Sequence, residues 1–128
     1  MNPEFLTIDE IIEIHRNQIK LYGGSIGIRD LKLLESAVCM PQSGFENCYL
    51  HKDIYEMAAA YLFHIVQNHP FVDGNKRLGL VSALIFLMNN CVVCKYDNEE
   101  LYKLTLETAN GNKNKNEISE FFREKVKK

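Results

Sequence analysis

The sequence predicts an all-α domain, a single bundle of about six helices over residues 1–128. Three observations favour this class. Apolar residues recur at helical spacing along most of the chain, residues typical of helix N-caps precede several of these segments, and glycine, proline or asparagine ends them. No internal repeat or low-complexity linker divides the chain, and its length suits one hydrophobic core rather than two.

The first two helices can be placed from their ends. A helix is expected over residues 8–22, because Thr7 and Glu10 form a capping-box pattern before it and a Gly-Gly pair follows it. Asp30 opens a second helix, which ends before Pro41 because the residue before a proline avoids helical backbone angles. The residues expected to face inward in this helix are Leu31, Leu34, Ala37 and Val38.

A connector and a third helix follow. Residues 41–52 begin with turn formers, and aromatic residues then alternate with other residues along the segment. This pattern favours a short hairpin or a loop over a helix. If this connector is an ordinary surface loop, Phe45 and Tyr49 are its anchors on the core. Asp53 caps the next helix, expected over residues 54–68, which has a wide apolar face.

Three more helices complete the prediction. The helix that begins near residue 76 and includes residues 78–88 is apolar on almost every side, which places it at the centre of the bundle. A capping-box pattern at Asp97 and Glu100 predicts a helix through Ala109. The polar run 112–116 is expected to be a solvated turn before a last helix over about 117–126.

Charge and composition limit the classes of partner. The formal net charge is −2, so neither nucleic acid nor an anionic membrane is expected to bind by general electrostatic attraction. The N-terminus lacks the pattern of a signal peptide, and the most apolar run is shorter than the ~20 residues of a membrane span, so a cytoplasmic protein is expected. The Cys-x-x-Cys pair at Cys91 and Cys94 follows an apolar helix and lacks further ligands nearby, which favours reduced thiols over a redox or zinc site.

The segment 69–77, His-Pro-Phe-Val-Asp-Gly-Asn-Lys-Arg, carries most of the reactive side chains. Its centre, residues 73–75, is made of turn formers, so the chain should reverse there and expose backbone amides at the start of the next helix. Lys76 and Arg77 oppose the dipole of that helix, and a bound phosphate would compensate them. The segment therefore predicts a phosphate site.

Each side chain of this segment also has an ordinary structural interpretation. His69 could be a helix cap or a general base, and Asp73 could be a turn residue or a ligand of a divalent cation. Phe71 is expected to anchor the loop in the core. Asn75 could be an N-cap or part of a phosphate-binding nest, whereas the planar fork of Arg77 suits phosphate.

The segment resembles the signature of the Fic/Doc family. The Fic form is His-Pro-Phe-x-Asp/Glu-Gly-Asn-Gly-Arg-x-x-Arg, and the Doc (death-on-curing) form is His-x-Phe-x-x-Ala/Gly-Asn-Lys-Arg. Here Lys76 replaces the second glycine of the Fic form, and Leu80 stands where its second arginine is expected. Both departures resemble the Doc branch, the toxins of toxin–antitoxin pairs, and the order of segments from residue 5 to about 111 is also similar to that of a small Doc-type toxin.

The resemblance implies a Fic-type helical bundle, with the connector as a flap that docks the target protein. It implies ATP or another nucleoside triphosphate as substrate, with Mg²⁺ held by Asp73. It assigns catalysis to His69 as general base together with Lys76 and Arg77. The residues that it places on the phosphates are Gly74, Asn75, Lys76 and Arg77.

Lys76 distinguishes two reactions in this family. In the Fic branch the glycine leaves room for the phosphates, and AMP is transferred from the α-phosphorus. In the Doc branch the resemblance implies a reversed nucleotide, so that the γ-phosphoryl group moves to a Ser or Thr hydroxyl. We therefore expect a protein kinase toxin that acts on a host translation factor, elongation factor Tu, and arrests growth; a Fic-type adenylyltransferase and a non-catalytic binding module are the alternatives.

The resemblance also predicts how such an enzyme is restrained. Many Fic proteins carry an inhibitory helix with the pattern Ser/Thr-x-x-x-Glu-Gly/Asn, and this pattern is absent from the sequence. Restraint is therefore expected from a Phd-like antitoxin bound in trans.

Overall fold

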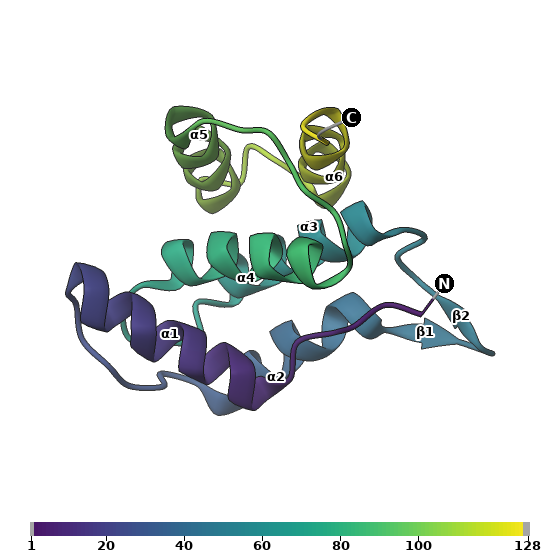
Figure 1. Ribbon diagram of the computed structural model, residues 1–128. Coiled ribbons are helices and arrows are strands. Elements are labelled where there is room, and N and C mark those ends of the chain that lie inside the picture. The colour runs from purple at the N-terminus through teal and green to yellow at the C-terminus, as the bar shows by residue number, and fades with distance from the viewer. Residues whose placement is uncertain (1, 127–128) are drawn as a thin grey trace.

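The computed structural model describes residues 2–126, and within that range it confirms the all-α class. Six α-helices, one short 3₁₀ helix and a two-stranded antiparallel hairpin make up the described chain (Figure 1). Their bounds are α1 Ile8–Tyr22, α2 Leu31–Cys39, η1 Met40–Gln42, β1 Gly44–Phe45, β2 Cys48–Tyr49, α3 Ile54–Asn68, α4 Asn75–Asn89, α5 Asn98–Ala109 and α6 Lys115–Glu124.

Helices α3 and α4 form the centre of the molecule, with α1 and α2 on one side and α5 and α6 on the other (Figure 1). The prediction of a central fourth helix is thus confirmed. Gly79 lets the two central helices approach, because a Cβ there would lie 2.9 Å from Val66 Cγ2 and 3.2 Å from the Leu62 carbonyl oxygen. The catalytic candidates occupy the loop that joins these helices and the first turn of α4.

Local caps place the helix ends much as predicted. The Thr7–Glu10 capping box is present, and Asp30 and Asp53 accept the amide hydrogens of residues three positions ahead. Asp97 accepts from the Glu100 amide at 2.7 Å, which is one half of the predicted capping box. The other half is not formed, because the Glu100 carboxylate pairs with Lys125 instead of reaching the Asp97 amide.

Two details of the predicted helices were wrong. Helix α6 begins at Lys115, two residues early, because Asn114 and Glu117 form a capping box inside the run that we expected to be a turn. Leu31 is 51% exposed and does not face the core, whereas the other three residues predicted to face inward in α2 are buried. As the first residue of α2, Leu31 projects toward the helix N-terminus and past its packed face.

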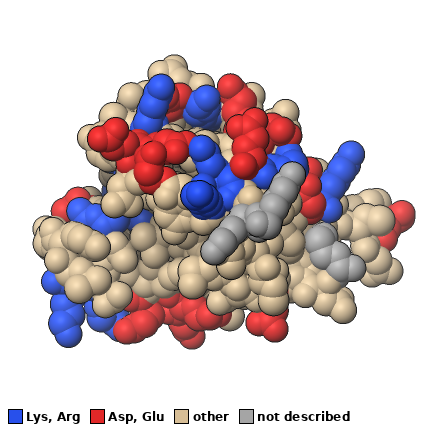
Figure 2. All heavy atoms as spheres, turned by 45° about the horizontal axis from the view of Figure 1, so that its top comes forward, with Lys and Arg blue, Asp and Glu red and all other residues tan. Residues whose placement is uncertain are grey.

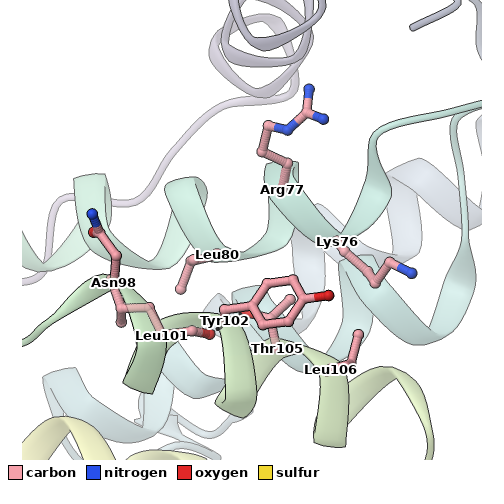
Figure 3. Close-up of a pocket in the computed structure, with 8 residues that line it drawn as sticks. All are labelled: Lys76, Arg77, Leu80, Asn98, Leu101, Tyr102, Thr105 and Leu106. Atoms are coloured by element: carbon pink, nitrogen blue, oxygen red, sulfur yellow. Dashed lines mark hydrogen bonds between the residues drawn. The ribbon is translucent and has the colours of Figure 1, made fainter. Parts of the chain in front are cut away.

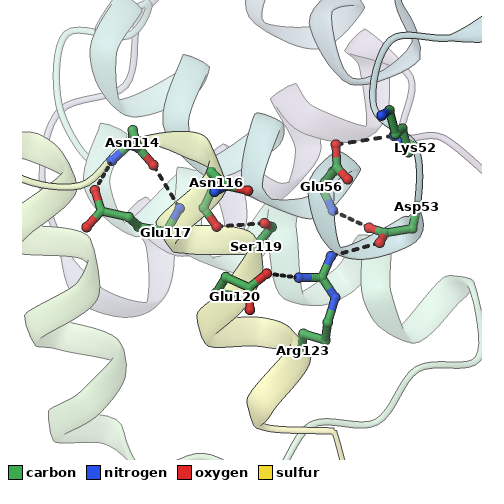
Figure 4. A network of polar contacts seen from close by, with 9 residues as sticks. All are labelled: Lys52, Asp53, Glu56, Asn114, Asn116, Glu117, Ser119, Glu120 and Arg123. Carbon is green, nitrogen blue, oxygen red and sulfur yellow. Dashed lines mark hydrogen bonds and ion pairs between the residues drawn. The ribbon is translucent and has the colours of Figure 1, made fainter.

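Polar contacts fasten α6 to the start of α3 (Figure 4). Arg123 Nη2 lies 2.8 Å from Asp53 Oδ2, so the residue that caps α3 also pairs with α6. Figure 2, which brings the α5–α6 side toward the viewer, shows basic and acidic side chains interspersed there. The described residues of this face therefore form no continuous surface of one charge.

The connector contains the predicted hairpin, and its turn residues Glu46 and Asn47 adopt positive φ angles of 50° and 67°. Tyr49 packs on Phe5 with 5.5 Å between ring centroids, but Phe45 is 80% exposed, so the expectation that both anchor the connector was wrong for Phe45. The hairpin joins the N-terminus of α3, whereas His69 lies one helix length away, about 22 Å for 15 residues (Figure 1). Its role as a flap stays a prediction.

Among residues 2–126, every helix is too short or too polar to cross a lipid bilayer. All four cysteines are unpaired, and those of the Cys-x-x-Cys segment are exposed at Cys91 and half-buried at Cys94.

Candidate functional site

His69 is the C-cap of α3 and adopts a left-handed conformation, with φ 50° and ψ 53°. Its amide donates to the Ile65 carbonyl at 3.2 Å, and the residue is exposed. No hydrogen bond among the described residues involves its imidazole, which leaves both ring nitrogens open to solvent or to a substrate. The side chain is thus placed where a general base could accept a proton.

Asn75 holds the loop closed from inside. It is 3% exposed, its Oδ1 accepts the Phe71 amide hydrogen at 2.9 Å, and its Nδ2 donates to the Phe71 carbonyl at 2.9 Å. The N-cap of α4 is Gly74, at φ 77°, so the suggestion that Asn75 is the N-cap was wrong. Asn75 is already the first residue of the helix, and its side chain faces inward, where it bonds both backbone groups of Phe71.

Phe71 is 2% exposed and packs in the hydrophobic core, which supports its predicted role as the anchor of the loop. His15 of α1 stacks on its ring with 3.8 Å between centroids, and His15 Nε2 lies 2.8 Å from the Asp73 carbonyl oxygen, to which it donates. Sequence reasoning missed His15. Its spacing from Ile11 and Ile19, four residues on each side, would have placed it on the buried face of α1.

Asp73 stands at the tip of the loop, where two amides hold its carboxylate. Oδ1 accepts from the Gly74 amide at 2.8 Å and Oδ2 from the Ser25 amide at 3.2 Å. A Cβ on Gly24 would lie 2.7 Å from Oδ2, so a glycine is needed there. Each carboxylate oxygen retains a lone pair, and a single exposed carboxylate fits Mg²⁺, which keeps several waters and takes phosphate oxygens.

The first turn of α4 offers three free amides. No hydrogen bond among the described residues uses the backbone N–H groups of residues 75–77, which point outward from the helix N-terminus. Lys76 is exposed beside them. Arg77 instead points toward α1, with its guanidinium 5.0 Å from the Tyr22 ring centroid and Nη1 3.4 Å from the Gln18 carbonyl (Figure 3).

A cavity of about 330 Å³ opens between α4 and α5 beside these amides. Figure 3 shows the stems of Lys76 and Arg77 at its border with both charged groups directed away from it. The remaining lining is mostly apolar and comes from both helices: Leu80, Asn98, Leu101, Tyr102, Thr105 and Leu106. A flat apolar group next to a phosphate would fit this arrangement.

The structure therefore places His69 at the start of the α3–α4 loop, Asp73 within it and the amides of residues 75–77 directly after it. It does not bring the Arg77 guanidinium to that loop. It adds three residues that the sequence did not single out: His15, Ser25 and Arg29, of which Arg29 donates to the carbonyl oxygen of His69 itself.

Comparisons with known proteins give one family. The family model described as Fic/DOC matches residues 5–87. "Protein kinase doc" of Escherichia phage P1 is 36% identical over 105 residues, which are 80% of this chain and 80% of that protein. "Toxin Doc" of Mycolicibacterium smegmatis is 38% identical over 71 residues, 56% of this chain and 55% of that protein.

Proposed function

The chain belongs to the Fic/Doc family, and we propose from this premise that it is a Doc-type toxin with protein kinase activity. The reaction is transfer of the γ-phosphoryl group of ATP, or of another nucleoside triphosphate, to a Ser or Thr hydroxyl of a host protein. Elongation factor Tu is the proposed target, and growth arrest the proposed outcome. The two relatives, a protein kinase and a toxin by name, support the toxin and kinase parts of this proposal.

One observation carries the proposal. A free imidazole at His69 and three free amides at residues 75–77 stand at the two ends of a loop whose backbone Asn75 holds through Phe71. Phosphoryl transfer depends mainly on in-line positioning and on positive groups around the phosphate oxygens. In this proposal the amides and Lys76 supply the positive groups, and His69 faces the attacking hydroxyl.

The mechanism assigns a task to each of these groups. His69 accepts the proton of the attacking hydroxyl as its oxygen bonds to the γ-phosphorus, and the bond from that phosphorus to the bridging oxygen breaks to release the nucleoside diphosphate. The amides of residues 75–77 donate to phosphate oxygens, and Lys76 adds charge from beside them. Asp73 would hold Mg²⁺, which when bound neutralises phosphate charge. Arg77 must leave Gln18 to join them.

The apolar cavity supports a place for the nucleoside. Its border lies at Lys76, next to the proposed phosphate site, and the Tyr102 ring on its rim is 67% exposed. We propose that the base enters this cavity against Tyr102, because an aromatic face binds a base by stacking.

The antitoxin is part of the same proposal. Leu80 occupies the position where the Fic form has its second arginine. Inhibition by a helix that blocks this arginine, as in many Fic proteins, therefore does not apply to this chain. We propose that a Phd-like antitoxin restrains the enzyme in trans. Co-expression of a small neighbouring reading frame should then relieve growth arrest.

The substitution His69→Asn tests the catalytic assignment. Asparagine tolerates the left-handed backbone of residue 69 but cannot act as the base, so the loop should keep its shape. We expect phosphoryl transfer and growth arrest to be lost, while the circular dichroism spectrum and Mg-ATP binding stay as in the wild type. Transfer at the wild-type rate by this variant would remove His69 from the mechanism, and nucleotide binding without turnover by the wild type would indicate a non-catalytic module.

Adenylyl transfer is the second candidate function. The segment from His69 to Asn75 fits the Fic form at every position, and only Lys76 and Leu80 depart from it. Label on the target from the α-phosphate of ATP would support this reaction over the kinase reaction.

A further inference from the structure

Residues 27–30 run beside the catalytic loop and are bonded to it. Ile28 and Phe71 form an antiparallel bridge, the Val72 amide donates to the Gly27 carbonyl at 3.0 Å, and the Asp30 amide donates to the Pro70 carbonyl at 3.0 Å. These backbone contacts join two segments about 40 residues apart in the sequence. They also place Arg29 directly against the end of α3.

Arg29 donates to three consecutive carbonyl groups. Its amide lies 2.7 Å from the Pro70 oxygen, its Nε 2.6 Å from the His69 oxygen and its Nη2 2.9 Å from the Asn68 oxygen. The last carbonyls of a helix have no partners within the helix and carry its negative dipole end. A guanidinium, which is planar and always charged, suits two adjacent carbonyls in this position.

These contacts act on a backbone that is otherwise disfavoured. His69 has a Cβ and sits at φ 50°, a region that residues other than glycine rarely adopt unless their surroundings hold them there. The guanidinium binds the carbonyl oxygens of Asn68 and His69, which belong to the two peptide groups that flank the Cα of His69. Arg29 thus holds the two peptide groups that set the backbone conformation of His69.

We propose that Arg29 is a positioning residue for phosphoryl transfer, one that fixes the backbone of His69 so that its imidazole faces the acceptor hydroxyl. This inference rests on the proposed role of His69 as general base. Arg29 contacts neither the amides of residues 75–77 nor Asp73 in the structure, so its effect is on the catalytic step rather than on nucleotide binding.

The variant Arg29→Met separates the side chain from the backbone contacts. Arg29 is exposed, and the bonds of its neighbours to Pro70 and Val72 do not need its guanidinium, so the domain should fold. We expect kcat to fall about 10- to 100-fold, as for a small displacement of a catalytic group, with KM for Mg-ATP changed less than about twofold. Arg29→Lys should recover part of this loss because its ammonium reaches one carbonyl. Arg16→Met is the matched control, because among the described residues this exposed arginine pairs with Glu13 alone.

A second readout does not depend on activity. The backbone coupling constant and amide exchange of residue 69, measured by NMR in ¹⁵N-labelled protein, should change in Arg29→Met and stay unchanged in Arg16→Met. Equal kcat in Arg29→Met and the wild type, or an unchanged residue 69, would overturn this inference alone. A fall in kcat/KM that comes entirely from a higher KM for Mg-ATP would also overturn it. A wild type that transfers no γ-phosphate would overturn the proposed function and this inference together.

Discussion

Replacing Asn75 by alanine should destabilise the whole domain, although the residue lies in the middle of a functional loop. The change removes two side-chain hydrogen bonds of 2.9 Å and leaves the buried amide and carbonyl of Phe71 without partners. Each unsatisfied group costs about 1–3 kcal/mol, and the better helix propensity of alanine returns only about 0.6 kcal/mol. The expected loss in the free energy of unfolding is therefore about 2–5 kcal/mol.

Urea denaturation followed by circular dichroism measures this loss, and calorimetry should show the melting temperature falling by about 8–20 °C for a domain of this size. Asn89→Ala is the matched control, because Asn89 is exposed on the same helix and should change stability by less than about 0.5 kcal/mol. A loss below about 1 kcal/mol in Asn75→Ala would refute the reasoning that the loop is clamped from inside.

Two further predictions concern other parts of the molecule. Burial is the main cause that lowers the pKa of His64 from 6.5 to about 4, followed by the charge of Lys115 at 3.1 Å and by His51. Between these pH values the unfolded chain binds more protons than the folded chain, so the free energy of unfolding should fall by about 1–2 kcal/mol from pH 6.5 to pH 4, allowing for partial exposure. Urea unfolding of His64→Gln should lack this part of the pH dependence. Tyr102→Ala should raise KM for ATP about 5- to 150-fold with little change in kcat, since it removes base stacking of ~1–3 kcal/mol. An unchanged KM would exclude the cavity as the nucleoside site.

The helices could be predicted because their signals are local. Thr7, Asp30 and Asp53 each cap a helix by accepting an amide three residues ahead, and this geometry follows from residue type and spacing. The start of α6 was missed for a related reason: Asn114 and Glu117 form a capping box, but they lie in a polar run that resembles a loop. Which residues of a helix face the core is harder to predict at its first turn, as Leu31 shows.

The candidate site was only partly visible in the sequence. His69, Asp73 and the first turn of α4 are contiguous, so one segment revealed them together. The groups that hold this segment come from elsewhere: Arg29 on the α1–α2 connection and His15 on α1 meet it only through tertiary packing. No spacing rule within a segment could have predicted these contacts, nor the position of the hairpin at the far end of α3.

The most direct measurement of the central claim is transfer of label to purified elongation factor Tu from ATP labelled at either the α or the γ phosphate, in the presence of Mg²⁺. We expect label on a Ser or Thr of the target from the γ position only, and none with His69→Asn. Label from the α position, or equal γ-label transfer by His69→Asn, would contradict it.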